Sequence, residues 1–301
     1  ILSLSLLATT TTVFVAACKS TSIPSVELND GVRMPVIALG TGGYDNDTAA
    51  GAVLTAFEAG MTHVHTAYDY YNLPGVGEGL SKAAERSEIS PCIHTAGNPK
   101  RNVTDPKECY DLTMKELHES LDLLGMQYVD LMLLHGPSEP FGYEGGCSRD
   151  ICALNAAQWR AYQDFQKMNK TRSIGVSNYC QSCIECLLSA TTTSVTPSVN
   201  QIQYHVGMGQ DPESLPSYCR SKGIVVQAYS PLAAGGVISS EACIRVGQAY
   251  NKTSAQVGLR WVLQQPSEPS LVVKSKSPKY IQEDISVFDW SLSPDDMDAL
   301  N

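Results

Sequence analysis

The sequence predicts an α/β fold, a (β/α)8 TIM barrel preceded by a β-hairpin, and three observations lead to it. Eight short runs of apolar and β-branched residues alternate with stretches of helical periodicity. No change of composition marks a linker, so residues 21–301 are expected to form a single barrel. Gly40-Thr41-Gly42-Gly43, after the first barrel strand, lacks the third glycine of a dinucleotide-binding Gly-x-Gly-x-x-Gly turn. A doubly wound open sheet is therefore the less favoured alternative fold.

The elements can be placed in order along the chain. Residues 27–32 predict the hairpin, because Asn29-Asp30-Gly31 supplies a tight turn between two short extended segments. Apolar runs then mark the eight barrel strands. We expect these strands at residues 36–39, 63–66, 92–95, 128–134, 173–176, 198–202, 224–228 and 271–273.

The clearest helical periodicity lies between the third and fourth barrel strands. Met114, Leu117, Leu121 and Leu124 recur at the spacing of one helix face, and charged residues occupy the positions between them. An amphipathic helix of this kind buries its apolar face. The segment therefore predicts a helix that packs on the outside of the barrel.

The first residues of the chain have the character of a targeting segment. Residues 1–18 carry no charge, but the run Thr9-Thr10-Thr11-Thr12 interrupts their apolar character, and a bilayer span needs about 20 apolar residues. We interpret residues 1–20 as the remnant of a signal peptide, with no stable membrane span. Two alternatives are a lipoprotein cleavage site that anchors the chain through Cys18 and a buried first helix.

Ten cysteines fit the secretory pathway, because disulfides persist in oxidising compartments. Cys147 and Cys152 form the best local pair, in a Gly-rich stretch that a disulfide could close. Cys180, Cys183 and Cys186 follow one another at steps of three, which favours packing or disulfides over a metal cluster. The remaining pairing cannot be deduced from the sequence.

Four Asn-x-Ser/Thr sequons point to the same compartment. They begin at Asn46, Asn102, Asn169 and Asn251, all in segments that we interpret as loops. We therefore expect a secreted, disulfide-bonded glycoprotein. The formal net charge of -10 and the absence of a basic run exclude nucleic acid as an expected partner.

Chemistry in a (β/α)8 barrel is located at the carboxyl ends of its strands. The motifs at or near these ends are Leu39-Gly40-Thr41, Thr66-Ala67 with Tyr70 and Asn72, the run from Asp130 to His135, Gly175-Val176-Ser177-Asn178, Asn200-Gln201, Ala228-Tyr229-Ser230-Pro231-Leu232, and Lys274-Ser275 followed by Ile281 and Glu283. In this order and spacing they resemble the motifs of the aldo-keto reductase family, and the resemblance extends over residues 26–300.

The resemblance implies reduction of an aldehyde or ketone by a nicotinamide cofactor. In that family a tyrosine donates the proton, a lysine paired with an aspartate eases its release, and a histidine orients the carbonyl. Tyr70 and His135 occupy the places of the tyrosine and the histidine. His65 replaces the aspartate and Ala96 replaces the lysine, so half of the catalytic tetrad is missing.

The double replacement is physically consistent, because losing both partners of a buried ion pair strands no charge. His65 joins Tyr70 and His135 as the third catalytic candidate of the altered site. Lys100 or Arg101, in the loop shortly after Ala96, could supply the positive charge of the missing lysine.

Cofactor positions are better kept. The resemblance implies that Ser177, Asn178 and Gln201 bind the nicotinamide carboxamide and that Tyr229 stacks on its ring. It also implies that four further residues bind the rest of the dinucleotide. Ser230 and Leu232 would contact the pyrophosphate, and Lys274 and Ser275 the adenosine 2′-phosphate.

The same resemblance names NADPH as the cofactor. Tyr280 replaces a family arginine and Asp284 replaces an asparagine, and both changes weaken recognition of a 2′-phosphate. NADH is therefore the alternative cofactor.

The substrate pocket departs from the family pattern as well. Gly42 and Gly136 stand where relatives often carry tryptophan, and the chain ends at Asn301, before the loop that many relatives place over the pocket. We expect an open site that accepts a small-molecule carbonyl substrate, bulky ones included, in a monomeric protein.

Histidine placement raises a metal alternative. His63, His65, His94 and His135 lie on three neighbouring strands, as in metal-dependent barrel hydrolases. No carboxylate near the later strand ends completes such a set, and we expect no metal.

Three function classes follow from these features. The first is an NAD(P)H-dependent carbonyl reductase with a rebuilt acid, and this is the one we favour. The second is a redox-neutral isomerase, dehydratase or cyclase that uses Tyr70, His65 and His135. The third is a binding protein without catalysis.

Overall fold

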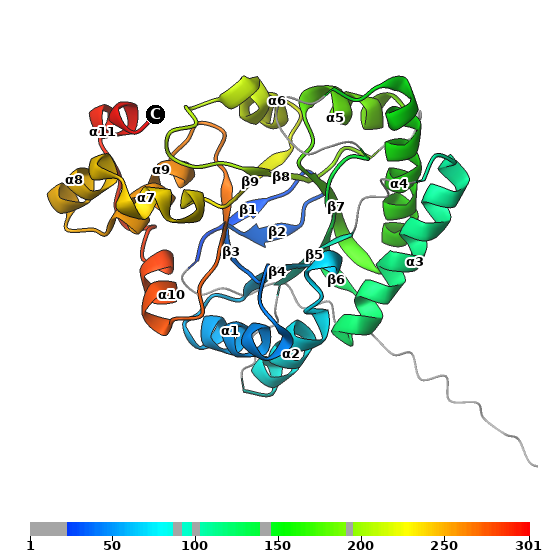
Figure 1. Ribbon diagram of the computed structural model, residues 1–301, viewed down its shortest axis with the longest axis horizontal. Coiled ribbons are helices and arrows are strands. Elements are labelled where there is room, and N and C mark those ends of the chain that lie inside the picture. Colours follow the sequence, from blue (N-terminus) through cyan, green and yellow to red (C-terminus); the bar gives the residue numbers. More distant parts are fainter. Residues whose placement is uncertain (1–22, 87–91, 98–102, 139–145, 191–194) are drawn as a thin grey trace, which may run out of the picture.

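Parallel strands close into a barrel in the computed structural model, which describes residues 23–86, 92–97, 103–138, 146–190 and 195–301 (Figure 1). The order around the barrel is β10-β3-β4-β5-β6-β7-β8-β9, and the ring closes where Val272 on β10 pairs with Ala38 on β3. The predicted (β/α)8 barrel is thus confirmed. Its strands are β3 (Ile37–Gly40), β4 (His63–Ala67), β5 (Cys92–Gly97), β6 (Val129–Leu134), β7 (Thr171–Ser177), β8 (Val199–Gln203), β9 (Val225–Tyr229) and β10 (Ser270–Val273).

Helices surround this ring and connect most of its successive strands (Figure 1). The α-helices are α1 (Asn46–Glu58), α2 (Leu73–Arg86), α3 (Pro106–Leu124), α4 (Arg149–Lys167), α5 (Gln181–Ser189), α6 (Leu215–Ser221), α7 (Gly236–Ser239), α8 (Glu241–Tyr250), α9 (Ser254–Leu263), α10 (Pro278–Ile285) and α11 (Pro294–Ala299). Three short 3-10 helices are η1 (Tyr68–Tyr70), η2 (Pro212–Ser214) and η3 (Ala233–Gly235).

Local sequence signals set the limits of α3. Asp105 caps its start by accepting a hydrogen bond from the Glu108 N–H at 2.8 Å, and Pro106 occupies the first turn. Gly125 ends the helix in the left-handed conformation, with φ of 67°. Leu117 and Leu121 are buried, as the periodicity predicted.

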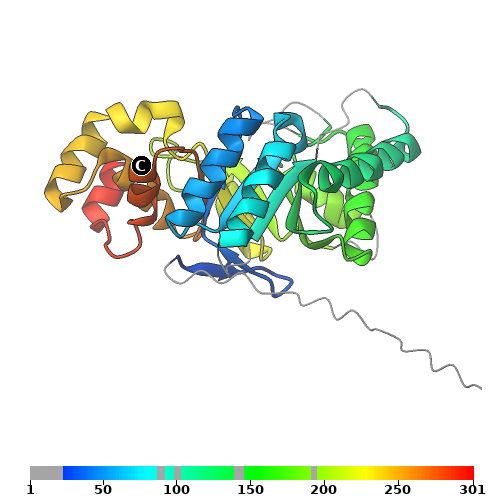
Figure 2. The ribbon, with the colours of Figure 1, turned by 90° about the horizontal axis from the view of Figure 1, so that it is seen from below.

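The N-terminal hairpin lies across one end of the barrel, where it appears as dark blue strands apart from the helices (Figure 2). It consists of β1 (Ser25–Glu27) and β2 (Arg33–Pro35), paired antiparallel. Gly31 takes φ of 81° in the predicted turn. Because β2 leads directly into β3, the hairpin covers the amino-terminal end of the strands, with Met34 in contact with Gln227 inside the barrel. The opposite, carboxyl end is left for the site.

The core fills both the barrel and the space between barrel and helices. Trp159, Trp261 and Tyr162 are among the largest side chains buried there. Inside the barrel the fit is close at Gly175, where a Cβ would stand 2.6 Å from Leu133 and 2.7 Å from the Val199 carbonyl oxygen. Any side chain at this position would displace β7 from its neighbours.

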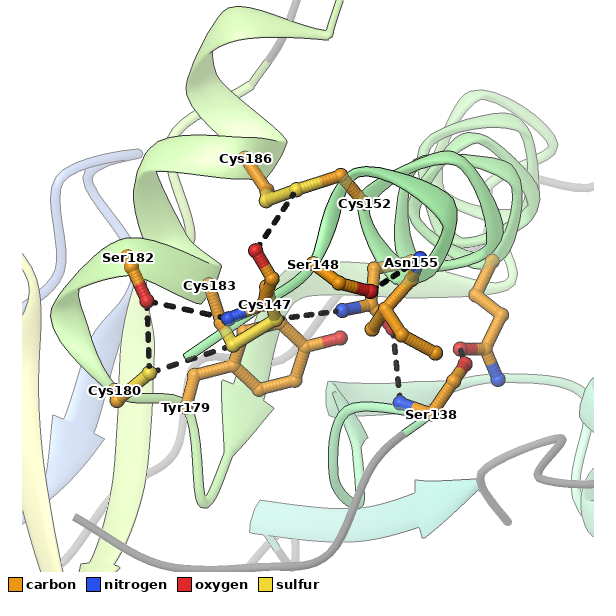
Figure 3. The surroundings of a disulfide bond; sticks show 12 residues. Ser138, Cys147, Ser148, Cys152, Asn155, Tyr179, Cys180, Ser182, Cys183 and Cys186 are labelled. Atoms are coloured by element: carbon orange, nitrogen blue, oxygen red, sulfur yellow. Dashed lines mark hydrogen bonds between the residues drawn. A yellow bond between two sulfur atoms is a disulfide. The ribbon is translucent and has the colours of Figure 1, made fainter. Parts of the chain in front are cut away.

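Two disulfides join the start of α4 to α5 (Figure 3). Cys147 is bonded to Cys183, and Cys152 to Cys186. The prediction that Cys147 pairs with Cys152 is therefore wrong. The steps of three along α5 turn Cys183 and Cys186 toward the two cysteines of the neighbouring segment, which the local sequence could not show. Cys180 is reduced and buried, with its Sγ 3.4 Å from that of Cys183.

Three of the sequon asparagines are exposed. Asn169 and Asn251 follow the ends of α4 and α8, in the left-handed conformation. Asn46 was expected in a loop but is the first residue of α1, where its Oδ1 accepts a hydrogen bond from the Gly75 N–H at 2.9 Å. Asn102 and the leader at residues 1–20 lie outside the described residues. Among the residues that are described, no helix has the length and apolar character to cross a membrane.

Candidate active site

A cavity of about 740 Å³ opens at the carboxyl ends of the strands, which is where this fold places its chemistry. All three catalytic candidates, Tyr70, His135 and His65, line it. Most of the predicted cofactor residues line the same space. They are Ser177, Asn178, Gln201, Tyr229, Ser230, Leu232 and Lys274.

Asn72 fixes the loops that hold Tyr70. Its Nδ2 donates to the carbonyl oxygens of Thr41 at 2.8 Å and Tyr44 at 3.0 Å. Its Oδ1 accepts from the Thr66 hydroxyl at 3.2 Å. One buried amide thereby joins the loop after β3 to the segment after β4, and η1 with Tyr70 follows in a defined position.

Tyr70 points its ring at the two candidate histidines. The ring centroids lie 6.0 Å from that of His65 and 5.7 Å from that of His135, both edge-on. Burial, with the nearby charge of Asp69 and the hydroxyl of Tyr229, raises the pKa of Tyr70 to about 12. The space beside Gly42, where we expected an open pocket, is occupied by Tyr70. A Cβ at Gly42 would lie 3.2 Å from two carbons of the Tyr70 ring. The tyrosine fills that part of the pocket.

His65 is a buried, neutral group. Burial lowers its pKa to about 3, and the neighbouring His135 and His63 act in the same direction. His63 is also buried, with a pKa lowered to about 4, and its Nδ1 lies 3.0 Å from the Pro35 carbonyl oxygen. A neutral imidazole thus stands where the family has a carboxylate. Lys100 and Arg101, the proposed alternative cations, lie outside the described residues.

His135 contacts a carboxylate that the sequence reasoning missed. Its Nδ1 lies 3.0 Å from Asp69 Oδ1, and both residues line the cavity. The Asn178 side chain donates to the carbonyl oxygen of His135 at 3.0 Å and fixes the backbone there. The available signal was the position of Asp69, an acidic residue directly before Tyr70 in a segment that leaves a strand end.

The predicted carboxamide-binding residues form one hydrogen-bonded group. The Ser177 hydroxyl donates to the Gln201 carbonyl oxygen at 2.9 Å, and Asn178 Nδ2 donates to Ser177 Oγ at 3.0 Å. The Tyr229 hydroxyl donates to Asn178 Oδ1 at 2.9 Å. Asn178 has φ of 60°, a left-handed conformation that asparagine tolerates well, so its amide turns back over the strand ends. Together these residues present polar atoms to the cavity.

A second cavity of about 370 Å³ extends the site toward α10. The two cavities share Leu232, Ile238, Lys274 and Asp284 as lining residues, so they are neighbours. Ser275, the last predicted cofactor residue, lines the second one. Two adjoining cavities that run from the barrel centre to the ends of β10 and α10 suit an extended ligand such as a dinucleotide.

The far cavity is electrostatically mixed. Lys274 lies over the Tyr44 ring, with its Nζ 4.5 Å from the centroid. Asp284 is buried, and burial together with Glu283 raises its pKa to about 7. Tyr280 is 57% exposed at the same end. The lining of this second cavity suits an adenosine group, and Lys274 and Ser275 suit its phosphate. An ionised Asp284 would repel that phosphate.

Within the described residues, no group of three histidine, cysteine, aspartate or glutamate side chains is arranged to hold a metal ion. The side chain of His94 lies outside this description.

Comparisons with known proteins agree with this geometry. Residues 36–301 match the Aldo/keto reductase family. An aldo-keto reductase of Mycolicibacterium vanbaalenii is 34% identical over 281 residues, which cover 93% of this chain and 92% of that protein. The crystal structure of an aldo/keto reductase from Brucella melitensis has 32% identity and a TM-score of 0.77, and the alignment covers 92% of this chain and 98% of that one. An aldo-keto reductase of Bombyx mori, solved in complex with NADP, has 28% identity and a TM-score of 0.76, with 93% and 92% covered.

Proposed function

The chain belongs to the aldo-keto reductase family, and on that premise we propose that it is an NAD(P)H-dependent oxidoreductase that reduces an aldehyde or ketone. One observation carries the proposal: Tyr70 and His135 line the same cavity as the polar group of Ser177, Asn178 and Gln201. Groups suited to a carbonyl oxygen and groups suited to a nicotinamide carboxamide thus share one space.

The residues of this chain divide the work along the two cavities. Ser177, Asn178 and Gln201 bind the carboxamide, and the half-buried Tyr229 supports the nicotinamide ring. Ser230 and Leu232 follow at the exit of β9, next to the pyrophosphate position. Lys274 and Ser275 bind the adenosine end. A bound reduced nicotinamide supplies the hydride, and Tyr70, His135 and His65 surround the carbonyl group that accepts it.

We propose NADPH as the cofactor, with NADH as its competitor. Lys274 and Ser275 favour the 2′-phosphate, and the loss of an arginine at Tyr280 and the gain of a carboxylate at Asp284 oppose it. The buried position of Asp284 makes its protonation state the deciding factor.

A cofactor titration tests the proposal. Purified protein is titrated with NADPH and NADH, and binding is followed by the emission of the cofactor and by calorimetry, before a screen of aldehydes and ketones. Tyr229→Ala should weaken binding roughly 10-fold because it removes the aromatic surface. Tyr218→Ala on α6 is the matched control and should bind as the wild type does. Failure to bind either cofactor at millimolar concentration would refute the reductase and direct the search to redox-neutral chemistry.

We also propose that the protein matures in the secretory pathway, with a lipid anchor at Cys18 as the alternative. Two disulfides and the exposed sequon asparagines Asn46, Asn169 and Asn251 support this location. Intact-mass measurement on protein made through a secretory host should detect a loss of mass on deglycosylation and a gain of at least four hydrogens on reduction, from the two disulfides of the described residues. An unglycosylated protein with ten free thiols would contradict it.

A further inference from the structure

The half-missing tetrad leaves Tyr70 a poor proton donor. The family's lysine is Ala96 and its aspartate is the neutral His65. What acts on the Tyr70 hydroxyl is burial, the Asp69 carboxylate and Tyr229, and all three raise its pKa, to about 12. A general acid loses efficiency as its pKa rises this far above neutral pH. Among the described residues that line the cavity, a group other than Tyr70 is therefore the better source of the proton.

The same carboxylate lies against His135. Asp69 Oδ1 lies 3.0 Å from His135 Nδ1, and the two side chains are 33% and 14% exposed. A carboxylate this close to one ring nitrogen favours the orientation of the imidazole in which Nδ1 faces Asp69. With Nδ1 turned to Asp69, Nε2 is the nitrogen that His135 can offer to a substrate oxygen.

We propose that His135, supported by Asp69, is the acid that protonates the substrate oxygen, and that Tyr70 donates a hydrogen bond to this oxygen without losing its proton. The inference rests on the reductase function proposed above and reassigns the roles within it. His135 is then the catalytic residue, and Asp69 is the positioning residue that acts through it.

The reduced nicotinamide supplies the hydride that forms the new C–H bond, and it is left oxidised. The electron pair of the C=O π bond passes to the oxygen, which forms an O–H bond with the proton of His135 Nε2. His135 is left neutral beside Asp69, and it is protonated again by the bulk solvent through the open cavity, which supplies the one proton that the overall reduction consumes. No further oxidant or reductant is needed.

Kinetics of three single variants and one double variant test the assignment. Asp69→Asn keeps the size of the side chain and removes the charge, so kcat should fall roughly 10²-fold with KM within about twofold. In His135→Gln, kcat should fall at least as far. In the double variant, kcat should fall no further than in His135→Gln, because the two residues act as one unit. In Tyr70→Phe, kcat should fall only about 10-fold, because the variant loses one hydrogen bond to the substrate oxygen. Asp47→Asn, His118→Gln and Tyr68→Phe are matched controls outside the cavity and should keep the wild-type kcat.

A spectroscopic measurement separates positioning from loss of structure. The ring nitrogen resonances of His135 in ¹⁵N-labelled protein should identify an Nδ1-bound proton in the wild type. This signal should change in Asp69→Asn, whereas His118 on α3 keeps its spectrum. Unchanged His135 resonances in this variant would show that the contact does not position the ring.

The outcomes distinguish the two proposals. A wild-type protein that turns over, with wild-type kcat in Asp69→Asn and no activity in Tyr70→Phe, overturns the His135 assignment and leaves the reductase intact. A wild-type protein that reduces no carbonyl compound removes the reductase function and the assignment with it.

Discussion

Asp284 and Lys274 both line the junction between the two cavities, so a buried carboxyl and a lysine lie at the same end of the proposed dinucleotide site. The charged groups around Asp284 are Lys274 from the end of β10 and Lys279 and Glu283 from α10. A neutral Asp284 adds no charge against the phosphate attraction of Lys274, and an ionised one cancels part of it.

Cofactor preference should therefore depend on pH. The pKa of Asp284 is about 7, so the ratio of the NADPH and NADH dissociation constants should rise as pH increases from about 6 to about 8, by roughly 10-fold. Asp284→Asn should bind NADPH more tightly and lose this dependence. Calorimetric titrations at several pH values measure both. A pH dependence that is the same in the variant would exclude Asp284 as its cause.

Crowding at Gly42 should change catalysis rather than folding. A Cβ at this position would stand 3.2 Å from two carbons of the Tyr70 ring, so Gly42→Ala should shift the ring and lower kcat/KM roughly 10-fold. Gly51→Ala on α1, where a Cβ meets nothing within 4 Å, is the control. Steady-state kinetics and thermal melting distinguish the two effects. Wild-type kinetics in Gly42→Ala would show that the Tyr70 ring is not held by this contact.

Acid should destabilise the fold through the two buried histidines. The folded-state pKa values of His63 and His65 are lowered to about 4 and about 3. Their stabilising contribution is complete above the unfolded pKa of about 6.5 and is lost as pH falls, by about 2 kcal/mol each at about pH 5. Between about pH 7.5 and about pH 5, the free energy of unfolding should decrease by roughly 2 kcal/mol less in His63→Gln than in the wild type. Urea denaturation at both pH values measures this.

Asp284 acts in the opposite direction and serves as the internal check. Its folded-state pKa is raised to about 7, so the stability that it contributes is present at low pH and is lost as pH rises through about 7. The acid-induced loss should consequently be larger in Asp284→Asn than in the wild type. A smaller loss in that variant would contradict the burial of a protonated carboxyl.

The disulfides should stabilise the α4–α5 region. Cys147 and Cys183 are 36 residues apart, a loop whose closure is worth about 4 kcal/mol in the chain-entropy account. Replacing both by serine should lower the melting temperature by several degrees, and Cys180→Ser should not. Peptide mapping under non-reducing conditions identifies the bonds directly. A Cys147–Cys152 peptide would contradict the pairing found here and restore the one that the sequence favoured.

The barrel was predictable because its strands are short apolar runs that alternate with helices, and because the ends of all barrel strands except β5 carry a recognisable motif. His65, Tyr70 and His135 could be placed together for the same reason, since parallel strands end at one face. The contact between Asp69 and His135 could not be predicted, because it depends on how η1 turns after β4. The disulfide partners of Cys147 and Cys152 depend in the same way on the packing of α4 against α5 and leave no trace in local spacing.

Transfer of isotope from the cofactor tests the account most directly. Protein loaded with NADPH that carries deuterium at both positions of C4 is incubated with an aromatic aldehyde, and the alcohol product is analysed by mass spectrometry. We expect one deuterium on the former carbonyl carbon, in an amount of alcohol proportional to the cofactor oxidised. Binding of the cofactor with no deuterated alcohol from any carbonyl compound tested would contradict it.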